Sequence, residues 1–358
     1  MKTGSYMKTR NHIKSIAALL LAMLLFLAGC GDQENTEQES EKDQAEPQSI
    51  EFFAMDTYMT LSVYSDNAEE ILEEGKALVM EMDEKFSAEN KKSQVAKLNR
   101  NRKGSIDEDT RYLLEKAITL YKDTDGVFNI AIYPVMKAWG FTTKKYKVPA
   151  KKTLERLISR MDLSALSISK DGKSASISKK GVKIDLGGIA KGYTSSKVVE
   201  LFKEKGVESA LVNLGGNVQA LGAKPDGSKW RVAIQSPDNE GEFLGVLEIA
   251  DKAAVTSGGY ERNFTKDDKT YHHIMDPETG YPARKGLVSV TVVSDDGTLA
   301  DGLSTSLFVM GKEKALDYWR AHSDQFDAVL MDKNGKLYVT KGLKDSFISE
   351  EYEIEIVE

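Results

Sequence analysis

The sequence predicts an α+β fold: one module of mixed, largely antiparallel sheet with flanking helices, built as a single body or as two lobes around a cleft. Two observations favour this class. Helical patterns are grouped early in the folded part and again after Ser195, and short strand patterns lie between them in adjacent pairs. Segregated helices and paired strands are typical of α+β proteins, whereas a doubly wound sheet alternates strands with helices.

Apolar residues at helical spacing predict the helices. Residues 69–99 suit one or two amphipathic helices, and residues 110–124 suit another. A shorter helix is expected over 153–159, with Thr153 as its N-cap. A longer helix is expected over about 189–205, directly after a pair of glycines.

Alternating apolar and polar residues predict the strands. Asp171-Gly172 forms a hairpin turn between the first two strands, and residues 333–336 form another turn late in the chain. The expected strands cover residues 166–169, 174–178, 182–185, 210–213, 230–235, 245–250, 288–293, 328–331 and 337–340.

The composition of the chain limits the number of domains and excludes some classes of function. Residues 50–358 contain no internal repeat, low-complexity block or second linker, so one folded domain is expected there. With 49 Lys and Arg against 56 Asp and Glu, the net charge is -7, which argues against a nucleic-acid binder. The single cysteine excludes an internal disulfide, a Cys-rich zinc site and an iron–sulfur cluster.

The N-terminus has the pattern of a bacterial lipoprotein signal. Four basic residues precede the apolar run 16–28, which is too short to span a bilayer. The run ends in Leu27-Ala28-Gly29-Cys30, where small residues precede the cysteine. We expect residues 1–29 to be removed as a signal peptide and Cys30 to carry a lipid such as palmitate. An uncleaved membrane anchor is the alternative.

An acidic segment follows Cys30. Residues 31–49 contain seven acidic residues and one lysine, so residues 30–49 are expected to be a disordered tether. Loss of residues 1–29 removes four positive charges, and the mature chain then carries 45 basic against 56 acidic residues, a net charge of -11. We therefore expect a protein held to the cell membrane by lipid on its extracytoplasmic face.

Three glycine-rich segments are candidates for ligand contact. Residues 183–193 run from an expected strand through Gly187 and Gly188 into a helix whose first turn carries Lys191. Free N–H groups at a helix start suit an anion such as phosphate, although a tight strand-to-helix connection explains the glycines equally well. Residues 213–217 and 256–259 repeat the theme, and three such loops favour the walls of a nucleotide cleft.

Two further segments carry groups that catalyse reactions. His272 and His273 are adjacent, so in a strand their rings would point to opposite faces and only one would serve a site. A histidine can act as a general base near neutral pH. Asp301 and Thr305 are four residues apart, which places a carboxylate and a hydroxyl on one helix face. Oxygen ligands favour a hard cation such as Mg²⁺.

Taken together, these segments resemble the FAD:protein FMN transferases, the ApbE family, over residues 50 to about 347. The resemblance rests on the order and spacing of Ala54-Met-Asp-Thr57, of 133–141, of 185–193, of 213–217, of 273–280 and of 301–305. It implies that FAD is split at its pyrophosphate, that AMP leaves, and that FMN is joined through a phosphoester to a Thr or Ser hydroxyl of an exported acceptor flavoprotein.

The resemblance also implies a role for each site residue. His273 would activate the acceptor hydroxyl, and Mg²⁺ would be held by Asp301, Thr305 and the backbone carbonyl of Gly188. FAD would be contacted by Met55, Trp139, Gly140, Phe141, Asp185, Lys191 and Ile274. Glu89 stands where the family usually has an aromatic residue. Two alternatives stay open: a Mg²⁺-dependent FAD pyrophosphatase, and a lipoprotein that binds flavin without chemistry.

Overall fold

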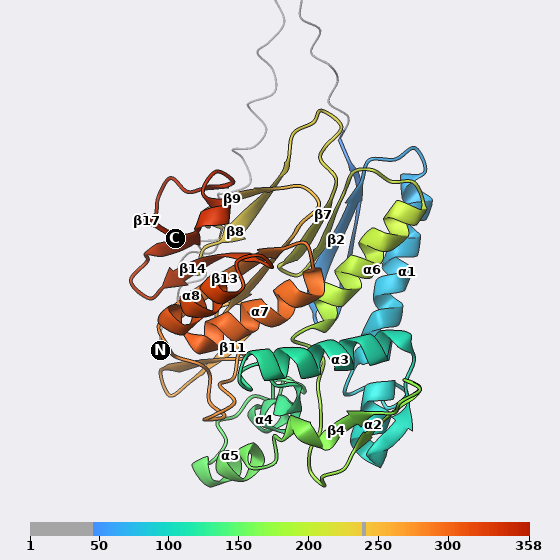
Figure 1. Ribbon diagram of the computed structural model, residues 1–358, viewed down its shortest axis with the longest axis vertical. Coiled ribbons are helices and arrows are strands. Elements are labelled where there is room, and N and C mark those ends of the chain that lie inside the picture. The colour runs from blue at the N-terminus through green and yellow to red at the C-terminus, as the bar shows by residue number, and fades with distance from the viewer. Residues whose placement is uncertain (1–45, 238–240) are drawn as a thin grey trace, which may run out of the picture. The chain divides into compact units, whose positions relative to one another are not determined.

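The computed structural model describes residues 46–237 and 241–358 (Figure 1). The predicted signal peptide, Cys30 and most of the predicted tether lie outside the described residues. The first strand begins at Gln48 and pairs along its whole length with the second strand. The folded module therefore starts two residues earlier than the Ile50 expected from the sequence.

A nine-stranded sheet forms the centre of the module. Its strand order is β1-β2-β6-β7-β10-β13-β14-β15-β17. Every neighbouring pair is antiparallel except β15 and β17, which are parallel. The strands are β1 (Gln48–Ala54), β2 (Thr57–Val63), β6 (Ala210–Leu214), β7 (Asn217–Leu221), β10 (Ala253–Gly258), β13 (Leu287–Ser294), β14 (Asp327–Asp332), β15 (Leu337–Thr340) and β17 (Ile354–Val357).

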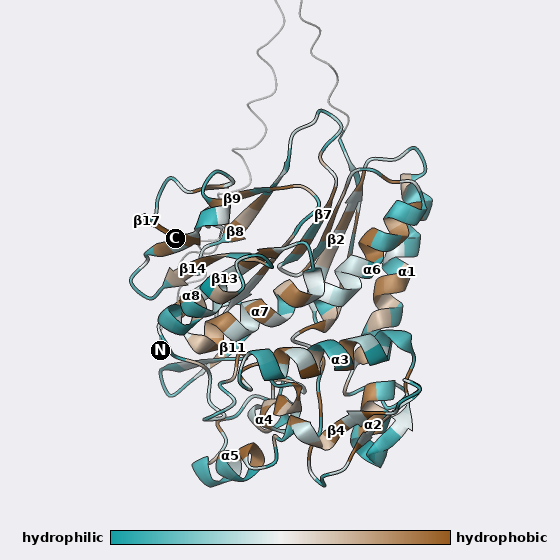
Figure 2. Cartoon of the chain, in the orientation of Figure 1, coloured by the Kyte–Doolittle hydropathy of each residue, from teal (hydrophilic) through white to brown (hydrophobic). Residues whose placement is uncertain are grey.

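Helices cover one face of this sheet. Helix α1 (Ala68–Phe86) packs on β1 and β2, α6 (Ala190–Glu204) packs on β6 and β7, and α7 (Gly297–Met310) packs on β10 and β13 (Figure 1). Helix α8 (Lys312–Ala321) follows α7 and packs against it and β14. Almost every residue of α7 is buried, and Figure 2 shows it as the most hydrophobic of these helices.

A small sheet covers part of the opposite face. Strands β8 (Trp230–Gln235), β9 (Phe243–Ile249) and β16 (Phe347–Ile348) form it, in the order β16-β9-β8. Trp230 and Leu247 of this sheet share a buried cluster with Ala254 and Val329 of the main sheet. The module is thus layered as helices, large sheet and small sheet.

A mainly helical segment packs against α7 on the side away from the large sheet (Figure 1). Leu120 and Phe128 of this segment share one buried cluster with Leu303 and Leu307 of α7, so the two parts have a common core rather than two separate ones. Its elements are α2 (Gln94–Asn101), β3 (Lys103–Ser105), α3 (Glu108–Asp123), α4 (Tyr133–Trp139), α5 (Lys151–Ile158), β4 (Leu166–Ile168), β5 (Ser174–Ile177) and the 3-10 turns Ile130–Ile132 and Leu163–Ala165. A two-stranded ribbon, β11 (Asn263–Lys266) and β12 (Lys269–His272), and the 3-10 turn Lys341–Leu343 complete the described elements.

The structure confirms the predicted α+β class and most of the predicted elements. The expected helix over 69–99 is the pair α1 and α2, and β4 and β5 pair as the predicted hairpin. Two local predictions were wrong. Residues 182–185 form no strand, because the side chain of Asn99 and the carbonyl of Ile130 bind their backbone. Helix α5 begins at Lys151, with Ala150 rather than Thr153 at its N-cap.

Within residues 46–237 and 241–358, no helix has both the length and the apolar composition needed to cross a membrane.

Candidate active site

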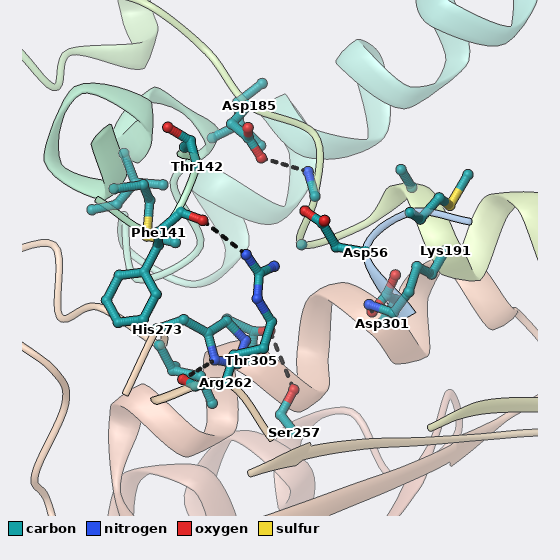
Figure 3. Close-up of a pocket in the computed structure, with 18 of the residues that line it drawn as sticks. Asp56, Phe141, Thr142, Asp185, Lys191, Ser257, Arg262, His273, Asp301 and Thr305 are labelled. Atoms are coloured by element: carbon teal, nitrogen blue, oxygen red, sulfur yellow. Dashed lines mark hydrogen bonds and ion pairs between the residues drawn. The ribbon is translucent and has the colours of Figure 1, made fainter. Parts of the chain in front are cut away.

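A cavity of about 630 Å³ lies where the helical segment, the first turn of α6, α7 and the turns of the large sheet come together. Sites for small-molecule ligands are commonly about 300–1,000 Å³ in volume. The walls come from distant parts of the sequence, from Met55 in the turn between β1 and β2 to Thr305 in α7. Figure 3 shows the polar side chains that point into this space.

Helices α6 and α7 meet at one wall of the cavity. The backbone N–H of Gly192, in the first turn of α6, donates a hydrogen bond to Asp301 Oδ2 at 2.8 Å. A Cβ at Gly192 would lie 2.1 Å from the carbonyl oxygen of Gly297, so only glycine permits this close crossing. The buried Asp301 carboxylate therefore sits at the positive end of the α6 dipole. The start of α6 was expected to suit an anion such as phosphate, and here the Asp301 carboxylate occupies that position.

The other carboxylate oxygen of Asp301 faces Lys191. Their Nζ and Oδ1 atoms are 3.7 Å apart, too far for a strong hydrogen bond but close enough for charge attraction. Thr305 lies one helical turn beyond Asp301, and its hydroxyl is 3.3 Å from the Ser257 hydroxyl on β10. Asp301, Thr305 and Gly188 all line the cavity.

This set of donors fits Mg²⁺. It would consist of the Asp301 carboxylate, the Thr305 hydroxyl and the Gly188 carbonyl that the resemblance implies, and all three are the hard oxygen ligands that Mg²⁺ prefers. No group of three or more His, Cys, Asp and Glu side chains is placed to hold a metal within the part of the chain that the structure describes. A metal here would therefore need further oxygens, and Mg²⁺ usually takes them from water and substrate phosphates.

His273 lines the cavity just after the end of β12 (Figure 3). Its Nδ1 atom is 3.2 Å from the carbonyl oxygen of Arg262. A carbonyl only accepts, so Nδ1 carries the proton and Nε2 keeps a free lone pair. Burial, together with the positive charges of Arg262 and Lys191, lowers the pKa of His273 to about 3. The ring is therefore neutral at pH 7.

Asp185 lies on the extended segment that precedes α6. Its Oδ1 atom accepts the N–H of Gly187 at 2.7 Å, and its own N–H donates to the carbonyl of Ile130. Burial raises the pKa of Asp185 despite this hydrogen bond and the nearby Arg262. On the preceding residue, both backbone groups of Ile184 bind the side chain of Asn99. This segment is therefore held in position mainly by contacts outside any sheet.

Arg262 spans the cavity between two walls. Its guanidinium donates to the carbonyl oxygen of Phe141 at 3.0 Å, while its own carbonyl binds His273 (Figure 3). Phe141 and Ile274 supply apolar surface beside these groups. Met55 also contributes to the wall, and its N–H donates to Asp83 Oδ2 at 3.0 Å.

Comparison with known proteins shows which family has this fold and these site residues' segments in common with the chain. The family model described as the ApbE family matches residues 55–330. The chain belongs to the ApbE family. The FAD:protein FMN transferase of Treponema pallidum is 30% identical over 349 residues, which are 91% of this chain and 93% of that protein. The one from Haemophilus influenzae is 29% identical over 333 residues, covering 90% and 94%.

Solved structures of ApbE proteins share the fold. The ApbE protein of Thermotoga maritima superposes with a TM-score of 0.78 at 30% identity, over 84% of this chain and 98% of that one. The flavin transferase ApbE of Vibrio cholerae superposes with a TM-score of 0.71 at 26% identity, over 85% and 97%.

Most site residues expected from the ApbE resemblance lie at the cavity, but two do not. Trp139 is fully buried away from it, and its indole N–H donates to the carbonyl of Gly280 at 2.7 Å. Gly140 ends α4 at a φ of 87°, where a Cβ would meet the carbonyl of Lys145 at 2.0 Å. Both residues shape the loop that presents Phe141. Neither residue lines the cavity in this structure, so their expected contact with the ligand stays a prediction. His272 also faces away, and its Nε2 atom donates to the carbonyl of Ala283.

Two cavity residues, Arg262 and Glu261, were not predicted from the sequence, whereas Glu89 was noted there. Arg262 and Glu261 follow the glycines of β10, in a turn whose sequence carries no recognisable pattern. Glu89 accepts hydrogen bonds from Tyr133 at 2.7 Å and from Lys137 at 3.2 Å. Burial alone would raise the pKa of Glu89, but these two donors outweigh it and lower the pKa overall. This wall of the cavity is therefore charged.

Proposed function

We propose that the chain transfers the FMN half of FAD to a hydroxyl group of another protein in a Mg²⁺-dependent reaction. Membership of the ApbE family and the shared name of the relatives, FAD:protein FMN transferase, support the transfer of FMN from FAD. The observation that carries the finer proposal is that His273, Asp301 and Thr305, far apart in sequence, line one cavity.

The acceptor in this proposal is a Thr or Ser hydroxyl of an exported flavoprotein. The hydroxyl oxygen forms a bond to the FMN phosphorus, and the bond from that phosphorus to the bridging pyrophosphate oxygen breaks. AMP leaves with the bridging oxygen and its electron pair, and Nε2 of His273 takes the hydroxyl proton. The neutral ring, held by the Arg262 carbonyl, has the tautomer that this role requires.

Asp301, Thr305 and the Gly188 carbonyl would hold Mg²⁺. The bound ion would neutralise the charge that develops on the pyrophosphate oxygens. Lys191 adds a second positive charge beside Asp301. Met55, Phe141, Asp185 and Ile274 line the remaining volume and are the proposed contacts to FAD.

Membrane attachment through Cys30 remains part of the proposal. It rests on the signal pattern at 27–30 and on the acidic segment that follows. Cells grown with labelled palmitate should incorporate label into the wild-type chain and not into a Cys30→Ala variant. Label that persists in the variant would show that the lipid is attached elsewhere.

One assay tests the activity. The purified chain is incubated with FAD, Mg²⁺ and an exported protein that carries the family's Thr-containing acceptor motif, and the products are separated by denaturing electrophoresis. We expect fluorescent flavin on the acceptor and AMP in solution. FMN and AMP without labelled protein would indicate a pyrophosphatase, and unchanged FAD would indicate a flavin carrier.

Two neighbouring variants separate catalysis from folding. His273→Asn should abolish labelling while FAD still binds, because the proton acceptor is lost but the cavity remains. His272→Asn is the matched control, since that ring faces away from the cavity, and it should label normally. Equal labelling by both variants would contradict the role assigned to His273.

A further inference from the structure

Two exposed aromatic side chains lie together on the hairpin whose turn lines the cavity. Seven large hydrophobic side chains are exposed in the described residues. Phe53 and Tyr58 are two of them, 51% and 80% exposed, and their rings meet edge to face with centroids 5.4 Å apart. Paired exposed aromatic rings are unusual on a free surface and common where proteins bind one another.

This aromatic pair lies next to the cavity wall. Phe53 and Tyr58 face each other across the β1–β2 hairpin, one residue before and after the pair that closes it. The hairpin turn, Met55 to Thr57, lines the cavity. A protein that rests on Phe53 and Tyr58 therefore lies next to a turn that forms part of the cavity wall.

A lysine-rich loop lies on the other side of that turn. Residues 142–152 contain five lysines and no acidic residue, in a chain whose net charge is -7. Lys144 Nζ is 2.9 Å from Asp56 Oδ1, so the loop and the hairpin turn meet directly. Lys145 and Lys147 are exposed and form no ion pair with any residue that the structure describes.

The loop is also attached to the cavity wall by aromatic contacts. The ring of Tyr146, a third exposed aromatic residue, packs against Phe141 with centroids 5.4 Å apart. Its other contact is a stacked arrangement with Phe264 of β11, at 5.0 Å and 12°. Phe141 itself lines the cavity. The lysines of the loop therefore occupy a fixed place at the cavity opening.

We propose that these two segments form the docking surface for the acceptor protein, which places its target hydroxyl in the cavity. The surface consists of Phe53, Tyr58, Lys144, Lys145 and Lys147, and is called the acceptor rim. The aromatic pair contacts apolar side chains of the acceptor, and the lysines contact an acidic segment beside the target hydroxyl. This inference rests on the proposed function, because only a transferase to protein has to seat a polypeptide at this opening.

The aromatic half of the acceptor rim is tested with the double variant Phe53→Ser/Tyr58→Ser. The substrate is the acceptor protein that the wild-type chain labels. Exposed interface aromatics often dominate binding, so we expect KM for this protein to rise by about tenfold or more. KM for FAD, and the labelling of a short peptide that spans the target threonine, should stay unchanged. Phe243→Ser is the matched control, since Phe243 is 53% exposed and does not line the cavity.

The charged half is tested with Lys145→Glu/Lys147→Glu, compared with Lys314→Glu, an exposed lysine on α8. At low salt the double variant should raise KM for the acceptor several-fold, and added salt should reduce the difference from wild type, because screening weakens exposed charge pairs. The control should behave as wild type.

Several outcomes would overturn the acceptor rim. Unchanged KM for the acceptor in both double variants would do so, although wild-type labelling would leave the transferase itself intact. A second such outcome is that the wild-type chain sediments with anionic phospholipid vesicles, the lysine variant does not, and KM for the acceptor is the same for both. The lysines would then bind a membrane rather than the acceptor. A wild-type dimer that becomes monomeric only in the aromatic variant would assign the aromatic pair to a second copy of the chain.

Discussion

Replacing Asn99 by alanine should weaken the fold and the cavity together. Asn99 is buried near the end of α2, 85 positions before the residue it binds. Its Nδ2 donates to the carbonyl of Ile184 at 2.8 Å, and its Oδ1 accepts the N–H of Ile184 at 2.7 Å. In Asn99→Ala both backbone groups lose their partner in a buried place.

The size of the effect follows from those two groups. A buried polar group left without a partner costs about 1–3 kcal/mol, so two of them should lower the free energy of unfolding by about 2–6 kcal/mol. A domain of about 300 residues unfolds with an entropy of about 0.6 kcal/mol per kelvin, which converts this loss to a fall in Tm of about 3–10 °C.

Two measurements check the reasoning. Calorimetry should show the fall in Tm, and titration of FAD fluorescence should show weaker binding, because Asp185 directly follows Ile184 on the released segment. Asn101→Ala removes an exposed amide from the same helix end and should leave both values unchanged. A Tm for Asn99→Ala within about 1 °C of wild type would refute the account.

Three other predictions follow from the site. Because the pKa of His273 is lowered to about 3, the ring stays neutral down to pH 5. A pH profile of kcat/KM for FAD should therefore show no acid limb near pH 6.5, and such a limb in the wild-type chain would contradict this. Asp301→Asn keeps an acceptor for the Gly192 N–H but loses the charge, so the Mg²⁺ concentration for half-maximal transfer should rise by about tenfold or more, as measured by titrating metal into chelator-treated protein. Trp139→Phe should lower the free energy of unfolding by about 2 kcal/mol through the lost hydrogen bond to Gly280, with KM for FAD unchanged; a raised KM would restore Trp139 to the ligand site.

The elements that could be predicted from sequence are those whose pattern matches their burial. Strands β8 and β15 have the predicted bounds, and α6 differs by one residue at each end. The ribbon of β11 and β12 was not predicted because its residues are exposed or half-buried on both faces, which leaves no alternation to detect. Helix α4 has seven residues and a proline in its first turn, too few to show a period. Helix α8 was not predicted either, although its buried residues Ala315, Leu316 and Trp319 have helical spacing.

The site residues that could be predicted from sequence are those that lie close together within one segment of the chain. Asp301 and Thr305 share a helix face whatever the rest of the chain does, so their spacing was informative. The resemblance to a family placed Trp139 near the ligand, but a motif records only that a residue belongs to the local arrangement. Whether an indole faces a cavity or a neighbouring carbonyl depends on distant residues such as Gly280 and Tyr271, which pack around Trp139.

The spread of the cavity walls along the chain affects when the protein can bind its ligand. Met55 and Thr305 are 250 positions apart, and both line the same space. Long-range contacts of this kind form late, because the chain must first close large loops. A growing or truncated chain that lacks α7 has no Asp301 and no wall at the start of α6. Ligand binding therefore reports that the whole module has folded, and the bound state stabilises every element at once.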